Sequence, residues 1–90
     1  MEFSGLWALI EQDLSRARDT LPGSALADPT IRQYQEFIDH NELELACDML
    51  GYYGEHNMVS QDFWLALRDA AAKMQLADLA SDFERHANGM

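Results

Sequence analysis

Apolar residues recur at three- and four-residue steps along most of the chain, which is the spacing of amphipathic α-helices. The first stripe comprises Leu6, Ile10, Leu14, Ala17 and Leu21. Ser4 precedes it with the side chain of a helix N-cap, whereas Pro22 and Gly23 follow it and favour a helix end. No segment alternates apolar and polar residues for long enough to form a strand. The pattern therefore predicts an all-α fold that begins with a helix ending near Pro22.

A second helix is predicted from Asp28, because Asp favours the N-cap position and Pro29 suits the first helical position. Its apolar face consists of Ile31, Tyr34, Phe37 and Ile38. His40 and Asn41 are expected to form a tight turn, since Asn tolerates turn conformations.

A third helix is predicted to follow from about Glu42. Its core-facing residues are Leu43, Ala46, Cys47, Leu50 and Tyr53. Gly51 and Gly54 lower the helix propensity, so we expect them to weaken its last turn and residues 54–57 to form a loop.

Ser60 is the predicted N-cap of a fourth helix, with Asp62 placed to favour the helix N-terminus. The apolar stripe of this helix comprises Phe63, Leu67, Ala70 or Ala71, and Met74, and helical spacing continues through Leu76, Leu79, Ala80, Phe83 and Ala87. One helix over 61–87 would be long for so small a domain, so a break is expected between Gln75 and Asp78. The sequence thus predicts a small bundle of four to five short antiparallel helices.

The methionines and tryptophans lie mostly at core-like spacing, and we expect most of them to pack in the core. These are the internal methionines Met49, Met58 and Met74 and the two tryptophans, Trp7 and Trp64. Met58 and Val59 also come just before the predicted N-cap, where an apolar residue can form a hydrophobic staple.

The chain has 90 residues, the size of one domain, which is predicted to span residues 1–90. Hydrophobic residues make up 48% of it, too many for a disordered chain. The single cysteine, Cys47, has no partner for an internal disulfide, which fits a reducing compartment. The N-terminus lacks the basic region of a signal peptide, and its longest apolar run, residues 6–10, is too short to span a membrane. We therefore expect a cytoplasmic protein.

The net charge is −10, from 16 acidic and 6 basic residues. Nucleic acids and anionic membranes would repel such a chain, so neither is expected to be a direct partner. Lys and Arg are absent from residues 33–67, which carry a local charge of −7. The acidic residues there are Glu36, Asp39, Glu42, Glu44, Asp48, Glu55 and Asp62. The negative charge is thus concentrated in the second helix, the third helix and the segment that follows.

On the third helix, Glu44 and Asp48 lie four residues apart and share one face with no cation to offset them. Two interpretations of this face are open. It is either a solvated acidic surface or a surface that binds a basic protein, with tyrosines for contact area and carboxylates for attraction. Under the second interpretation, the partner-binding residues are Glu42, Glu44, Asp48, Tyr52, Tyr53, Glu55 and His56.

The sequence contains no residue pattern typical of catalysis or metal binding. His40 and Glu44 are four residues apart, but the predicted turn at Asn41 separates them, and no His or Cys cluster has metal-ligand spacing. Cys47 lies on an apolar helix face, where free cysteine acts as a small hydrophobic residue. A glycine-rich phosphate loop, a calcium loop and the Asp-Ser-Leu motif of acyl carrier proteins are all missing. We therefore predict no enzymatic activity, no metal and no cofactor.

The segment from Phe37 to Met74 contains an ordered series of helix and turn features. After a short turn, a Glu and then a small residue open a helix, and here these are Glu42 and Ala46. A Leu pair, a Glu, a short apolar loop and a Ser-capped apolar helix follow. Their counterparts are Met49, Leu50, Glu55, Met58, Val59, Ser60, Phe63, Leu67, Ala70 and Met74. This arrangement resembles the MafI family of small bacterial immunity proteins.

The resemblance implies an immunity protein that is made beside a polymorphic toxin of a contact-dependent growth inhibition system or a related secretion system. Such a protein binds the toxic domain in the cytoplasm and blocks it. The implied partner is a cognate toxin domain, and a basic nuclease would suit the acidic composition. We expect the chain to be a monomer. The alternative is a small acidic helical adaptor or regulatory module, which would expose an apolar groove or dimerise.

Overall fold

The computed structural model describes the backbone of residues 2–89 and the side chains of residues 5–89. This part of the chain forms five α-helices and no strand, so the predicted all-α fold is confirmed. The helices are α1 (Glu2–Asp19), α2 (Pro29–Asp39), α3 (Leu43–His56), α4 (Gln61–Lys73) and α5 (Ala77–Ala87). A short 3-10 helix, η1 (Gly23–Ala27), connects α1 to α2.

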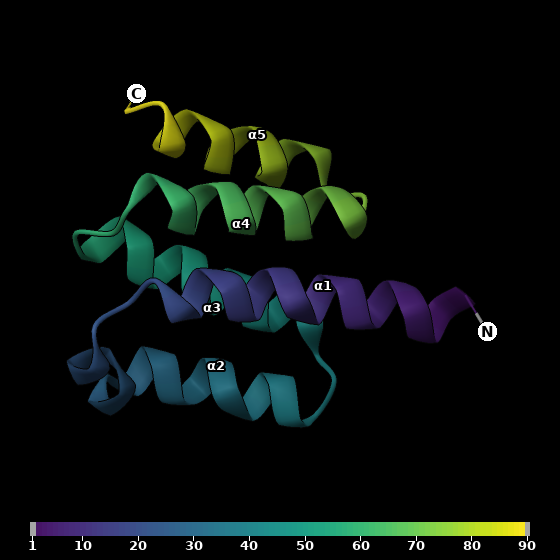
Figure 1. Cartoon of the computed structure of the whole chain (residues 1–90), viewed down its shortest axis with the longest axis horizontal. Helices are drawn as coiled ribbons and strands as arrows, with labels where there is room; N and C mark the ends of the chain where they lie inside the picture. Colours follow the sequence, from purple (N-terminus) through teal and green to yellow (C-terminus); the bar gives the residue numbers. More distant parts are fainter. Residues whose placement is uncertain (1, 90) are drawn as a thin grey trace.

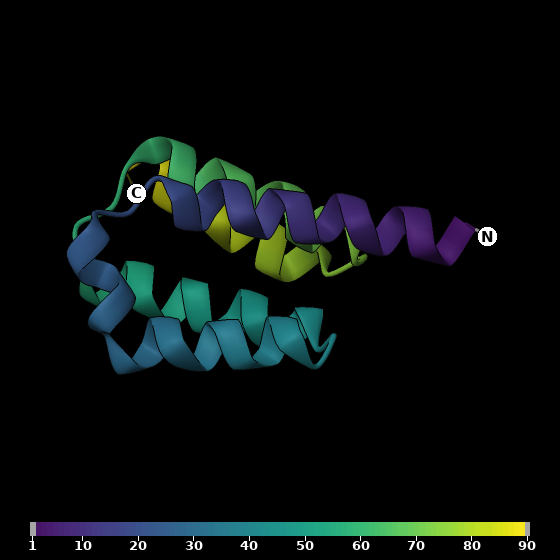
Figure 2. The same ribbon diagram turned by 60° about the horizontal axis from the view of Figure 1, so that its bottom comes forward.

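The helices form two layers, which Figures 1 and 2 show from two directions. In one layer, α4 lies between α1 and α5 and packs against both. In the other layer, α2 and α3 form an antiparallel hairpin, and α3 packs against α1 and α4 across the interface. As a result α3 and α5 run in the same direction (Figure 1) and belong to different layers (Figure 2).

Two helix starts follow the predicted capping chemistry. The Asp28 carboxylate accepts a hydrogen bond from the backbone N–H of Thr30 at 2.8 Å. The Ser60 hydroxyl accepts one from the backbone N–H of Phe63 at 3.2 Å. Each cap satisfies a backbone donor that the first turn of a helix leaves without a partner.

Two turns use a residue in the left-handed conformation. Asn41, with φ of 59°, lies in the α2–α3 turn, and Gln75, with φ of 61°, separates α4 from α5. Asn adopts this conformation more readily than other residues with a side chain. The predicted break between Gln75 and Asp78 is confirmed, because α4 ends at Lys73 and α5 begins at Ala77.

Two local predictions are wrong. Ser4 does not cap α1, because the helix already begins at Glu2. The segment 54–57 is not a loop, because α3 continues to His56. Aromatic rings of α4 and α5 lie directly against the α3 backbone at its two glycines, and this packing stabilises the helix where its intrinsic propensity is low.

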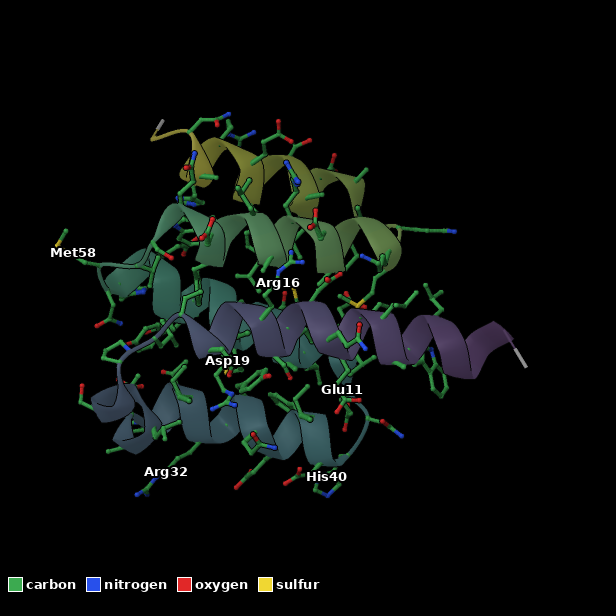
Figure 3. The ribbon with its side chains drawn as sticks, viewed as in Figure 1. Glu11, Arg16, Asp19, Arg32, His40 and Met58 are labelled. Carbon is green, nitrogen blue, oxygen red and sulfur yellow. The ribbon has the colours of Figure 1, made fainter. Side chains whose placement is uncertain are left out.

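The core lies between the two layers and is built from the predicted apolar stripes. Its largest fully buried side chains are Tyr34, Phe63, Leu14, Leu50, Leu67 and Cys47. Trp7 is 52% exposed instead, because the first turns of α1 extend past the other helices (Figure 1). Met58 is 99% exposed and extends from the α3–α4 turn (Figure 3). Met58 therefore forms no hydrophobic staple, whereas Val59 is partly buried against the core.

Candidate functional site

The basic side chains of α1, α4 and α5 are paired with acidic side chains within the molecule. Arg16 of α1 forms an ion pair with Asp69 of α4 at 2.8 Å, and Lys73 of α4 forms one with the buried Asp13 of α1 at 2.5 Å. The remaining Lys and Arg pairs are Arg16–Asp13, Arg18–Asp19, Arg68–Asp69, Arg68–Glu84 and Arg85–Asp82. Five of the six Lys and Arg residues are thus engaged in this layer.

The outer face of α3 carries acidic side chains without such partners. Glu44 and Asp48 are exposed, and neither forms an ion pair with any residue in the part of the chain that the structure describes. Partial burial, and secondly the charge of Glu44, raises the pKa of Asp48 above its usual value. The two carboxylates repel one another, and no cation within residues 5–89 forms an ion pair with either of them.

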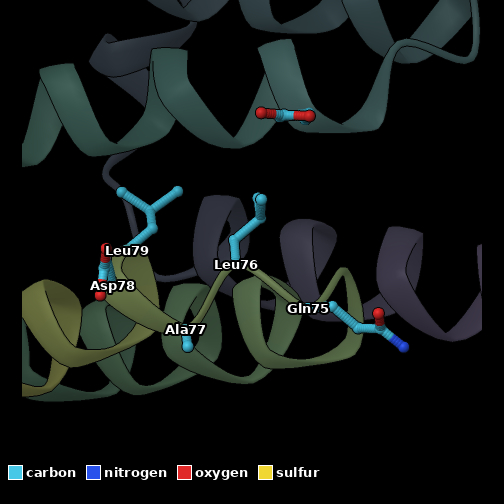
Figure 4. Close-up of a pocket in the computed structure, with 6 residues that line it drawn as sticks. Gln75, Leu76, Ala77, Asp78 and Leu79 are labelled. Atoms are coloured by element: carbon cyan, nitrogen blue, oxygen red, sulfur yellow. The ribbon is translucent and has the colours of Figure 1, made fainter.

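Beside this face, α3 and α5 enclose a groove made of two adjoining hollows, which we call the α3–α5 groove. The first hollow has a volume of about 490 Å³ and is lined by Glu44 and residues 75–79. In Figure 4, Leu76 and Leu79 point from the start of α5 toward α3 across this hollow. The second hollow has a volume of about 190 Å³. Its lining consists of Asp48, Gly51, Tyr52, Glu55, Leu79 and Phe83. Leu79 lines both hollows, so they adjoin at this side chain.

Side chains of α4 and α5 also contact one another and α3 next to residues that line the second hollow. The ring of His86 stacks on Trp64 with a centroid separation of 4.3 Å, and its Nε2 lies 3.7 Å from Oε2 of Glu55. The ring of Phe83 lies against the backbone of Gly51, where a Cβ atom would be only 3.0 Å from the ring. Because Gly51 has no side chain, the Phe83 ring of α5 can reach the α3 backbone at this hollow.

Four of the seven predicted partner-binding residues line the groove, namely Glu44, Asp48, Tyr52 and Glu55. Glu42 is exposed at the N-terminal end of α3 and makes no capping hydrogen bond there. His56 stacks on Tyr52, with ring centroids 4.2 Å apart. Tyr53 does not belong to this surface, because it is 8% exposed and packs in the core. Successive helical residues point about 100° apart, so Tyr53 faces the core while its neighbour Tyr52 faces outward.

Sequence reasoning missed the α5 side of the groove. The apolar spacing of the C-terminal segment includes Leu76, Leu79 and Phe83. This spacing does not indicate that Leu76 and Leu79 stay only partly buried. The spacing of Gly51 and Gly54, three residues apart on α3, was the available signal that another helix approaches closely.

The groove offers a partner apolar side chains and carboxylates. Among the described side chains, those of residues 5–89, no group of three His, Cys, Asp or Glu is arranged to hold a metal ion. Cys47 is fully buried, and burial, with smaller contributions from Asp48 and Glu44, raises its pKa to about 12. A thiol with that pKa is not a nucleophile at neutral pH. Over the same residues, no helix is long and apolar enough to cross a membrane.

Comparison of the chain with protein-family models, with curated proteins and with solved structures found no match. The resemblance to immunity proteins therefore rests on the residue pattern from Phe37 to Met74, and membership of that family stays a prediction.

Proposed function

We propose that this chain is a protein-binding inhibitor that binds a basic protein domain at the α3–α5 groove. The observation that carries the proposal is the unequal distribution of ion pairs. The cations of α1, α4 and α5 are paired within the molecule, whereas Glu44 and Asp48 have no cation beside them among the described residues. Carboxylates placed in this way do little for the stability of the free chain, but they attract and orient a basic partner.

The partner that we propose is the toxic domain of a bacterial polymorphic toxin, as the resemblance implies. A nuclease fits best, because nucleases use Lys and Arg side chains to hold phosphates. The α3 carboxylates would pair with those cations and exclude the substrate, while Tyr52, which is 52% exposed, would supply contact area. The chain would act in the cytoplasm as a monomer and without catalysis.

The test measures cell survival and association rate with the toxic domain encoded beside the gene for this chain. Glu44→Lys plus Asp48→Lys should slow association by about tenfold or more and reduce protection, because attraction is replaced by repulsion. The matched control is Glu36→Lys plus Asp39→Lys, which makes the same change in net charge on exposed positions of α2. Circular dichroism shows whether each variant is folded.

Three outcomes would contradict the proposal. Failure of the wild-type chain to protect would refute the immunity function. Unchanged binding by the α3 variant would refute the surface assignment. An equal loss in both variants would show that net charge alone, and not the α3–α5 groove, governs binding.

An adaptor is the second candidate, and two observations favour it. The α3–α5 groove has an apolar floor, and Leu6, Trp7 and Leu9 in the N-terminal half of α1 are 38%, 52% and 48% exposed. The first turns of α1 extend beyond the other helices (Figure 2). Exposed apolar side chains in such a group often mark an interface. Light scattering of the wild type and of Trp7→Lys separates the candidates. A dimer that the substitution disrupts would favour the adaptor, and a monomer in both cases favours the inhibitor.

A further inference from the structure

The shape and chemistry of the α3–α5 groove also specify what kind of segment it binds. We propose that its occupant is a basic amphipathic α-helix of the partner, which lies lengthwise between α3 and α5 and places apolar side chains in the two hollows. This inference rests on the proposed function for the choice of binding face. It adds the secondary structure and residue pattern of the partner segment.

The groove has the length of a short helix. From Glu44 to Glu55 it follows eleven residues of α3, or about 16 Å at the α-helical rise per residue. Leu79 lines both hollows, and their other lining residues are offset by about one to two helical turns along α3 and α5. Side chains four or seven residues apart on one face of a helix have this separation.

The lining of each hollow combines an apolar floor with carboxylates. The floor consists of Leu76, Leu79 and Phe83. Glu44 and Asp78 line the first hollow, and Asp48 and Glu55 line the second. Neither hollow has a Lys or Arg among its described lining residues. A Leu or Met side chain of the partner would be buried on the floor, and Lys or Arg side chains one turn away would meet the carboxylates.

A helix suits this groove better than an extended segment. The backbones of α3 and α5 are hydrogen-bonded within each helix, so they offer no open edge to which an extended peptide can add as a strand. A helical partner satisfies its own backbone and brings only side chains to the groove. A second copy of this chain is disfavoured as the occupant, because each copy has a net charge of −10.

The test uses two synthetic peptides of about 15 residues, which span the groove with one turn to spare. The first has two Leu residues four positions apart on one helical face, flanked by Lys. The second has the same composition in an order that scatters the Leu residues around the helix. Calorimetry at two salt concentrations gives the affinities, and backbone amide shifts of the full chain locate the site. We expect the first peptide to bind at least about tenfold more tightly, since only it buries both Leu side chains. The largest shifts should occur at Gly51, Leu76 and Leu79.

Leu79→Ala is the most informative variant, because Leu79 lines both hollows. It should weaken binding of the first peptide by about tenfold and leave the second unchanged. Leu26→Ala is the matched control, because Leu26 is 56% exposed in η1, outside the groove. Asp78→Lys is a second variant at an exposed position, and it tests the first hollow even if Leu79→Ala is poorly folded.

The outcomes separate this inference from the proposed function. Equal affinities of the two peptides would overturn the helical occupant, and the charge-reversal variant of Glu44 and Asp48 would still test the acidic face. Largest amide shifts on α1 or α2 would overturn the groove as the peptide site. If neither peptide binds but that variant loses protection against the toxin, the helical occupant is wrong and the proposed function stands.

Discussion

Gly54→Ala should destabilise the protein, although alanine is the better helix former. At an exposed position inside a helix, the substitution would stabilise the fold by up to about 1 kcal/mol. At Gly54, however, a Cβ atom would lie 2.5 Å from Cη2 of Trp64 and 2.7 Å from Cε1 of Phe63. Carbon atoms in favourable contact are about 3.5–4.0 Å apart, so one methyl group would overlap two rings.

Neither ring has free space to move into, because Phe63 is fully buried and Trp64 is 6% exposed. Either α3 must move away from α4 or the rings must leave their preferred rotamers. Overpacking of this kind costs about 1–3 kcal/mol, which exceeds the gain in helix propensity. We expect a net loss of about 1–2 kcal/mol and a fall in Tm of roughly 5–15 °C.

Two other glycines provide matched controls for the same substitution. Gly5→Ala should stabilise the chain by a few tenths of a kcal/mol to about 1 kcal/mol, because no atom lies within 4 Å of the added Cβ. Gly51→Ala should fall between the two, because its Cβ would meet only the edge of the Phe83 ring, at 3.0 Å. Urea unfolding followed by circular dichroism gives all three values. A Gly54→Ala variant as stable as the wild type would refute ring packing as the reason that α3 continues to His56.

Three further predictions concern charge and titration. Lys73→Met should lower the free energy of unfolding, measured in urea titrations, by about 1–3 kcal/mol, because it removes the closest cation from the buried Asp13 carboxylate. Arg85→Met, which breaks an exposed pair, should change the free energy of unfolding by less than about 0.5 kcal/mol. Partial burial and a neighbouring carboxylate raise the pKa of Asp48, so its ionisation opposes folding. Asp48→Asn should therefore raise stability by a few tenths of a kcal/mol at neutral pH. Thermal melts should show this gain shrinking as the pH falls toward 3.8, the ordinary pKa of Asp, because the native carboxyl takes up its proton before the unfolded one. Cys47 should react with thiol reagents only after unfolding, and because burial raises its pKa from 9.0 to about 12, its thiol ionises first in the unfolded chain. The free energy of unfolding should accordingly fall as the pH rises from 9.0 to about 12, and it should fall less steeply in Cys47→Ala. The same pH dependence in both proteins would contradict the raised pKa of Cys47.

Most of the fold was predictable because the signals that define it act over a few residues. Asp28 and Ser60 mark helix starts through hydrogen bonds to nearby backbone N–H groups. The break at Gln75 follows from the length of helix that a small domain accommodates. The glycines of α3 show where local reasoning fails. Their low helix propensity is a local property, but the aromatic rings that pack on them belong to other helices.

The candidate site was predictable only on its α3 side. Helical periodicity placed Glu44 and Asp48 on the outer face, and the same periodicity places Tyr52 outside and Tyr53 in the core. The α5 side was not predictable, because a five-helix chain allows several helices to lie beside α3. Only the packing order of the two layers shows that Leu79 faces the same groove as these acids.

The uneven placement of charge between the two layers acts at distances beyond contact. Residues 28–57, which form the α2–α3 layer, contain seven acidic residues and a single basic one, while the other five cations lie in the opposite layer. The molecule therefore has an electric dipole in addition to its net charge of −10. A positively charged protein that approaches it exerts a torque as well as an attraction. The torque rotates the molecule so that the α2–α3 layer faces the approaching protein. The rate at which two proteins associate is limited by how often they meet in the right orientation. A partner whose field orients this chain before contact should therefore associate with it faster.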